Sequence, residues 1–173
     1  FFFPQYPILR IIGRLTFPLF AWFIANGARH TKDANRYLAN VFLFAVISQT
    51  PFTLLHWEHD SGFWKLNAIF TLFLGLIAVI AIRRYSHMLI RAGTVIVCAL
   101  LAMLFETEYG AWGVLSVVAF SLTLDNIKRM VLWQSAIFVL SFGVPVFLPV
   151  FSLNALQMLI LQMPFILALL VIQ

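Results

Sequence analysis

The chain has 173 residues, of which 63% are hydrophobic and only 10% are charged. Soluble domains are roughly half apolar and a quarter charged, so this composition excludes a water-soluble globular fold and predicts a single transmembrane domain over residues 1–173. The net charge of +5 does not indicate nucleic-acid binding, because the basic residues fall in short clusters between apolar runs. The partner that this pattern predicts is the lipid bilayer.

A transmembrane helix needs about 20 mostly apolar residues. Runs of that kind predict an all-α, polytopic membrane helix bundle with about seven transmembrane helices. In chain order, the expected helices cover approximately residues 10–28, 37–55, 63–82, 88–105, 109–124, 130–148 and 154–172. We expect an interruption of the sixth helix at residues 143–145, and Pro164 lies within the seventh.

Loop charges predict the orientation, because short cytoplasmic loops are enriched in Lys and Arg. The first, third and fifth connections hold or adjoin almost all of the loop bases, which are Arg29, Lys32, Arg36, Arg83, Arg84, Arg91, Lys128 and Arg129. The other connections hold Lys65 alone. The odd connections are therefore expected on the cytoplasmic side of the membrane. The first helix then starts outside, so we expect an earlier transmembrane helix before Phe1.

Charged residues inside apolar helices are costly and often functional. Arg10 and Arg14 share one face of the first helix, near its outer end, with Pro18 one turn further along. Glu106 ends the fourth helix on the same outer side. An Arg14–Glu106 pair would offset the cost of both charges, and the carboxylate could act as a general base. The alternatives are interfacial arginine anchors and an exposed acidic loop.

Neutral polar groups lie at the same depth. Asn67 enters the third helix, and Ser48 and Gln49 lie on the second. Such side chains either contribute to a site or join helices by hydrogen bonds. On the cytoplasmic side, a basic loop suits phosphate groups or anionic lipid headgroups; its residues are Arg29, His30, Lys32 and Arg36.

No metal site is expected. The second loop holds two histidines and two carboxylates that could be drawn as metal ligands, but a solvated outer loop is the simpler interpretation. These residues are His56, Glu58, His59 and Asp60.

Several stretches together resemble the TraX family over roughly residues 8–124. The most specific is the Gly-Arg-x-x-Phe-Pro-x-Phe core within residues 10–20. The others are Asn26-Gly27, His30-Thr31, Tyr37, residues 48–52, residues 67–71 with Gly75, and residues 106–113. Two family features, an Asp-His pair upstream of the core and a Phe-Tyr-Pro-x-His-like stretch near the end, do not occur. We therefore expect that segments are missing at both ends, one of which could carry the catalytic base.

The resemblance implies a multi-pass inner-membrane protein of conjugal-transfer systems that acetylates the N-terminus of pilin with acetyl-CoA. The acyl donor would bind in the cytoplasm at Arg29, His30, Lys32 and Arg36. The acceptor would meet a catalytic cluster of Arg14, Asn67, Glu106 and Tyr109 on the outer side.

The leading hypothesis is thus a membrane-embedded acyltransferase that moves an acetyl group from CoA to an amine or hydroxyl acceptor. A small-solute transporter is the first alternative, because buried charges and Pro or Gly breaks also suit alternating access. A structural membrane component of an envelope assembly is the second. Binding of CoA to the purified protein would separate the first hypothesis from the other two.

Overall fold

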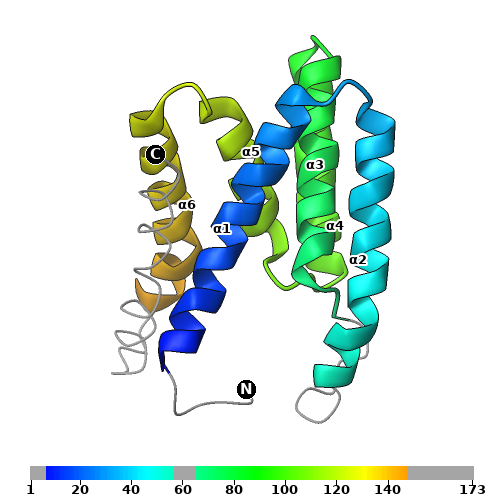
Figure 1. Cartoon of the computed structure of the whole chain (residues 1–173). Coiled ribbons are helices and arrows are strands. Elements are labelled where there is room, and N and C mark those ends of the chain that lie inside the picture. The colour runs from blue at the N-terminus through cyan, green and yellow to red at the C-terminus, as the bar shows by residue number, and fades with distance from the viewer. Residues whose placement is uncertain (1–6, 57–64, 148–173) are drawn as a thin grey trace. The chain divides into compact units, whose positions relative to one another are not determined.

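A computed structural model describes residues 7–56 and 65–147, and this part of the chain is helical with no β-strand. The helices are α1 (Pro7–His30), α2 (Ala34–His56), α3 (Ala68–Arg84), α4 (Met88–Leu104), α5 (Gly110–Thr123) and α6 (Ile127–Phe147) (Figure 1). They confirm six of the expected helices to within a few residues at most boundaries. The seventh, expected at 154–172, lies outside the described residues.

Two details of the expected helices are wrong. The third helix begins at Ala68 rather than near Phe63, because the side chain of Asn67 accepts hydrogen bonds from the N–H groups of Ile69 and Phe70 and so caps the helix there. The sixth helix is not interrupted at 143–145 but continues to Phe147. Prolines are tolerated inside apolar helices, and α1 and α2 likewise run through Pro18 and Pro51.

One described helix is both long and apolar enough to cross a membrane, over Ala34–Leu54 of α2. Met88–Leu104 and Gly110–Thr123 are shorter apolar helices. A bundle with about seven spans therefore stays a prediction.

The chain divides into two compact units. One comprises residues 1–20 and 123–173, and its described part holds the beginning of α1 and the whole of α6. Phe17 and Met130 are buried there, as is the polar side chain of Gln134.

The second unit comprises residues 21–122 and holds the rest of α1 and helices α2 to α5. Helix α3 packs against both α2 and α4, and its buried residues lie between Thr71 and Ala81. It also approaches α5 closely: a Cβ atom added to Gly75 would lie 2.7 Å from the Cβ of Val117. Only glycine therefore fits at this crossing without a shift of one helix.

Small side chains dominate the interior of the 21–122 unit, whereas many large apolar side chains are exposed. The buried small residues include Ala21, Ala25, Ala28, Ala45, Ala78, Ala81 and Ala102. The exposed residues of α2 include Phe44 and Ile47, each 60% exposed, and α4 exposes Leu100 and Met103. Close packing through small residues, with large apolar groups outside, is the pattern of helices that pack within lipid.

Candidate functional site

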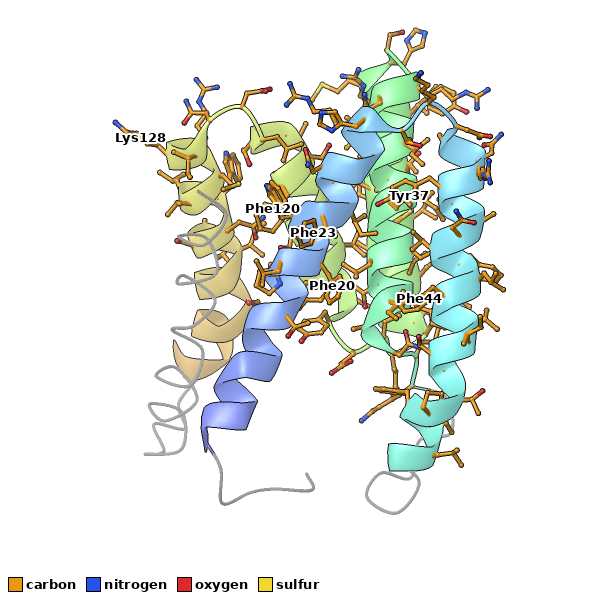
Figure 2. All side chains as sticks on the ribbon, viewed as in Figure 1. Phe20, Phe23, Tyr37, Phe44, Phe120 and Lys128 are labelled. Carbon is orange, nitrogen blue, oxygen red and sulfur yellow. The ribbon has the colours of Figure 1, made fainter. Side chains whose placement is uncertain are left out.

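The 21–122 unit carries polar groups at its two ends. At one end, α1 joins α2 and α3 joins α4, and Figure 2 shows side-chain nitrogen atoms gathered there. The exposed basic residues of this end are Arg29, His30, Lys32, Arg36, Arg83, Arg84, His87 and Arg91. The structure thus brings together the four residues expected to bind the acyl donor. We call this group of residues the basic end.

The turn between α1 and α2 is held by local hydrogen bonds. The backbone N–H of Thr31 donates to the carbonyl of Gly27 (2.9 Å), which continues the helical pattern past the end of α1. Asp33 then starts α2, because its carboxylate accepts a hydrogen bond from the N–H of Arg36 at 3.0 Å. The turn therefore has a defined conformation, from which the side chains of Lys32 and Arg36 extend into the surroundings.

Tyr37 closes the same turn on its inner side. Its hydroxyl lies 3.5 Å from the carbonyl oxygen of Ile24 in α1. A Cβ added to Gly27 would lie 2.6 Å from that hydroxyl, so the absence of a side chain at Gly27 makes room for the ring. The phenol thereby packs α2 against the last turns of α1.

Arg83, near the end of α3, caps the C-terminus of α1. Its guanidinium donates one hydrogen bond to the carbonyl of Ala28 and a second, at 3.2 Å, to the carbonyl of Arg29. The last carbonyls of a helix have no partner within the helix and carry its partial negative charge, so a cation there is favourable. This contact joins two helices that are far apart in sequence.

At the other end of the unit, Asn67 and Gln49 form a hydrogen-bonded pair between α2 and the start of α3. The side-chain oxygen of Gln49 accepts from the backbone N–H of Asn67 at 3.0 Å, and its amide nitrogen donates to the carbonyl of Lys65 at 2.9 Å. The amide nitrogen of Asn67 donates to the carbonyl of Ala45 at 2.9 Å. Asn67 is only 4% exposed, so its amide holds α3 against α2.

Glu106 lies in the turn between α4 and α5, in an unusual backbone conformation. Its φ angle is +45°, in the left-handed region that favours glycine. Its N–H donates to the carbonyl of Met103, and the N–H of Thr107 donates to the carbonyl of Ala102, which is the Schellman arrangement at a helix end. Glycine is the usual residue at this position, so the structure tolerates a glutamate there at a cost in stability. Its side chain is exposed.

The backbone places this turn beside Asn67. The N–H of Glu108 donates to the carbonyl of Leu66, the residue before Asn67, at 3.0 Å. Tyr109, half-buried, follows at the start of α5. The structure therefore brings three of the four expected catalytic residues together, namely Asn67, Glu106 and Tyr109. We call this region, with Gln49, the polar end.

The polar end and the basic end lie at opposite ends of α3, as the course of the helix in Figure 1 shows. Asn67 precedes the first residue of this helix, and Arg83 is next to its last residue. A helix of this length measures about 25 Å at a rise of about 1.5 Å per residue.

Comparison with known proteins identifies the family. A family model described as "TraX protein" matches residues 1–171 of the chain. The chain belongs to this family. The TraX match covers both units and thus confirms the resemblance derived from the Gly-Arg-x-x-Phe-Pro-x-Phe core.

A curated relative adds a second point of comparison. The chain is 30% identical over 133 residues to the "Probable fimbrial assembly protein FimC, serogroup H1" of Dichelobacter nodosus. The aligned part is 70% of this chain, and the chain spans about half the length of the relative, 50%. No solved structure matches this TraX-family chain.

The fourth expected catalytic residue, Arg14, lies within α1 in the part of the helix that belongs to the other unit. Its side chain and that of Arg10 lie outside the described side chains, so the Arg14–Glu106 pair stays a prediction. The loop sketched with metal-ligating residues falls largely at 57–64, also outside the description. Among the described residues, no group of three His, Cys, Asp or Glu could hold a metal ion.

At the two ends of the 21–122 unit, the structure gives Gln49 and Arg83 roles that the sequence does not predict. Gln49 appears in the sequence as a hydrogen-bonding group without a partner, and Arg83 as one of several loop charges. The position of Arg83 at the end of an apolar helix is compatible with this role, since a cation there can reach the carbonyls of a neighbouring helix end. Its target depends on which helices are neighbours.

Proposed function

We propose that this chain is part of a multi-pass acyltransferase of the bacterial inner membrane, which transfers an acetyl group from acetyl-CoA to an amine or hydroxyl acceptor. The observation that carries the proposal is the two-ended 21–122 unit, with a basic end that suits phosphates and a polar end that holds Asn67, Glu106 and Tyr109. Membership of the TraX family supports it.

Residence in the membrane is supported by the distribution of side-chain sizes. Alanine is the commonest buried residue of the 21–122 unit, whereas Phe44, Ile47 and Leu100 are exposed. In water, such exposed apolar surface would cost about 25 cal/mol for each Å² left uncovered. In hydrocarbon, the same surface is well solvated, and close contact through small residues holds the helices together.

The acyl donor would bind at the basic end. CoA carries several phosphate groups, and these are complementary to a cluster of exposed cations on a turn of defined conformation. The residues proposed for this role are Arg29, His30, Lys32 and Arg36. Their predicted cytoplasmic side is the side on which acetyl-CoA is available.

The acceptor would react at the polar end, and the extended arm of CoA would carry the thioester there from phosphates bound at the basic end. An amine must be neutral to attack the thioester, so a base takes its proton. The amine nitrogen bonds to the carbonyl carbon, the C–S bond breaks, and the CoA thiolate recovers a proton. Glu106 is the proposed base and Arg14 its proposed partner. Tyr109 is proposed to contact the acceptor, and Asn67 to position the turn, because its side chain is already engaged in hydrogen bonds.

Glu106 is the most informative of these residues. A left-handed glutamate at the end of α4 costs stability that a glycine would restore, and strained residues cluster at functional sites. A glutamate at a position that favours glycine supports a role for its carboxylate in the chemistry.

The acceptor class that the family resemblance suggests is the N-terminus of pilin, and the relative's printed name, a probable fimbrial assembly protein, agrees with an acceptor or partner in fimbrial assembly. A structural component of such an assembly, without catalysis, is the second candidate on the same ground. A small-solute transporter has no specific observation in its favour.

The test is transfer of the radiolabelled acetyl group of acetyl-CoA to the acceptor, in membranes that carry the full-length protein. We expect acceptor-dependent incorporation that Glu106→Gln abolishes, whereas Glu108→Gln, two positions away in the same turn, retains most of it. Purified protein that binds CoA but shows no transfer with any pilin-like acceptor would contradict the catalytic part. Failure to bind CoA would favour the structural candidate.

A further inference from the structure

The basic end contains one arginine that is used differently from its neighbours. Arg83 directs its guanidinium at the backbone of α1, with hydrogen bonds to the carbonyls of Ala28 and Arg29. Arg84, next to it, is exposed as Arg83 is, but makes no side-chain hydrogen bond to the part of the chain that the structure describes. Two adjacent residues with the same side chain thus differ in their hydrogen-bond partners.

The bonds of Arg83 complete the C-terminus of α1. Three consecutive carbonyls at this end have partners outside the helix: that of Gly27 bonds to the N–H of Thr31, and those of Ala28 and Arg29 bond to Arg83. Removal of the guanidinium would leave two of them to water or to an alternative partner. The last turn of a helix frays when its carbonyls lose their partners.

The segment held in this way is the one that carries the proposed donor-binding cations. Arg29 provides one of the two carbonyls, and His30 and Lys32 follow directly. A guanidinium that donates to two carbonyls in a fixed fork restricts both the position and the direction of this segment, which a single ammonium cannot do.

We propose that Arg83 is a positioning residue of the basic end, which fixes the Arg29–Lys32 segment in the conformation that binds phosphate groups and does not itself contact the anion. For the identity of the ligand, this inference rests on the proposed function. For the order of the segment, it stands on the hydrogen bonds alone, and the two parts can be tested separately.

The first measurement is the mobility of a spin label at Lys32→Cys in the purified full-length protein. The described part of the chain has one native thiol, Cys98, which is buried, so the introduced thiol is the accessible one there. We expect higher mobility with Arg83→Gln and with Arg83→Lys, and no change with Arg84→Gln, the matched control. Unchanged mobility in both Arg83 variants would overturn the inference, whatever the protein binds.

The second measurement is the affinity for CoA, without a label, at several salt concentrations and well below the melting temperature. We expect Arg83→Gln and Arg83→Lys each to weaken binding about tenfold, the typical consequence of losing a charge-assisted hydrogen bond. The salt dependence should stay that of the unaltered protein, because no charge that contacts the ligand is removed. Arg36→Gln, which removes such a contact, should weaken binding and flatten the salt dependence.

The outcomes separate the two proposals. Full recovery of affinity by Arg83→Lys, or a flatter salt dependence in Arg83→Gln, would overturn the inference, since Arg83 would then act by its charge on the ligand. Higher label mobility in a protein that does not bind CoA would support the positioning of the segment and refute the proposed donor. A lower melting temperature with unchanged affinity would show a purely structural role and so contradict the inference.

Discussion

The side-chain oxygen of Gln49 accepts a hydrogen bond from the backbone N–H of Asn67 at 3.0 Å, across the contact between α2 and the start of α3. The same glutamine side chain donates to the carbonyl of Lys65, and Asn67 donates to the carbonyl of Ala45. The side chain of Gln49 in α2 thus bonds to the backbone of the segment that precedes α3. This bond sets the position of the polar end relative to α2.

Replacement of Gln49 by leucine should destabilise the 21–122 unit. The backbone N–H of the buried Asn67 would lose its partner, and the carbonyl of Lys65 would lose one hydrogen bond. An unsatisfied buried polar group costs about 1–3 kcal/mol. Unfolding of the purified protein in mixed micelles measures this change. Thr50→Val is the control, because Thr50 is exposed beside Gln49 on the same helix; it should change stability by less than about 0.5 kcal/mol. Equal effects of the two variants would show that the pair contributes nothing specific.

Two asparagines cap helices in this chain and differ in their surroundings. Asn67 accepts from two N–H groups of α3 and also bonds to α2. Within the described residues, the exposed side chain of Asn126 accepts from the N–H of Arg129 alone. Asn67→Ala should therefore cost about 1–2 kcal/mol and Asn126→Ala about 0.5 kcal/mol, at opposite ends of the range for N-caps. Thermal unfolding followed by circular dichroism measures both. The order of the two losses is the decisive result, and a larger loss for Asn126→Ala would contradict the structure.

Glycine at position 106 should make the protein more stable and less active. Glu106→Gly relieves the left-handed strain at the end of α4, a gain of about 1 kcal/mol. Acetyl transfer should be lost if the carboxylate is the base. Gly110→Ala is the opposite experiment: its φ is +50° with no atom within 4 Å of an added Cβ, so strain alone should lower stability. Loss of stability in Glu106→Gly would refute the conformation, whereas retained transfer would refute the catalytic role.

The crossing of α3 and α5 should not accept a methyl group. In Gly75→Ala, the new Cβ would lie 2.7 Å from the Cβ of Val117, and such overpacking costs about 1–3 kcal/mol. Gly93→Ala adds the same methyl in α4, where no atom lies within 4 Å, and should stabilise that helix by about 0.5–1 kcal/mol. Val117→Gly, which removes the Cβ that lies closest, should make Gly75→Ala less costly than it is beside valine. Absence of this rescue would mean that the two helices do not cross there.

The packing of Tyr37 on α1 predicts a similar pair. A Cβ on Gly27 would meet the Tyr37 hydroxyl at 2.6 Å, but this atom is the end of a side chain that can move. Gly27→Ala should cost about 1 kcal/mol, at the lower end of the overpacking range. Tyr37→Phe, which removes the hydroxyl, should recover part of that loss when the two changes are combined. Simple additivity of the two effects in a double-mutant cycle would contradict the contact.

The sequence predicts most of the residues that lie at the polar end but not the contacts between them. Asn67, Glu106 and Tyr109 were grouped because consecutive antiparallel helices bring alternate connections to the same end of a bundle. The bond between Glu108 and Leu66 agrees with that grouping. The hydropathy pattern places the start of α3 near Phe63 instead of at Ala68. Hydropathy is averaged over a window, so it does not show where a side chain such as that of Asn67 caps the helix.

The sequence by itself determined that the chain is helical, where six helices lie, and which connections carry the basic residues. These properties are local: an apolar run of a given length forms a helix wherever it packs, and charges collect in the connections between such runs. Only the tertiary structure decided that Gln49 bonds to Asn67, that Gly75 faces Val117, and that Arg83 rather than Arg84 caps α1. Each of these contacts joins residues of different helices, and its partner is chosen by how the helices pack, which no short stretch of sequence contains.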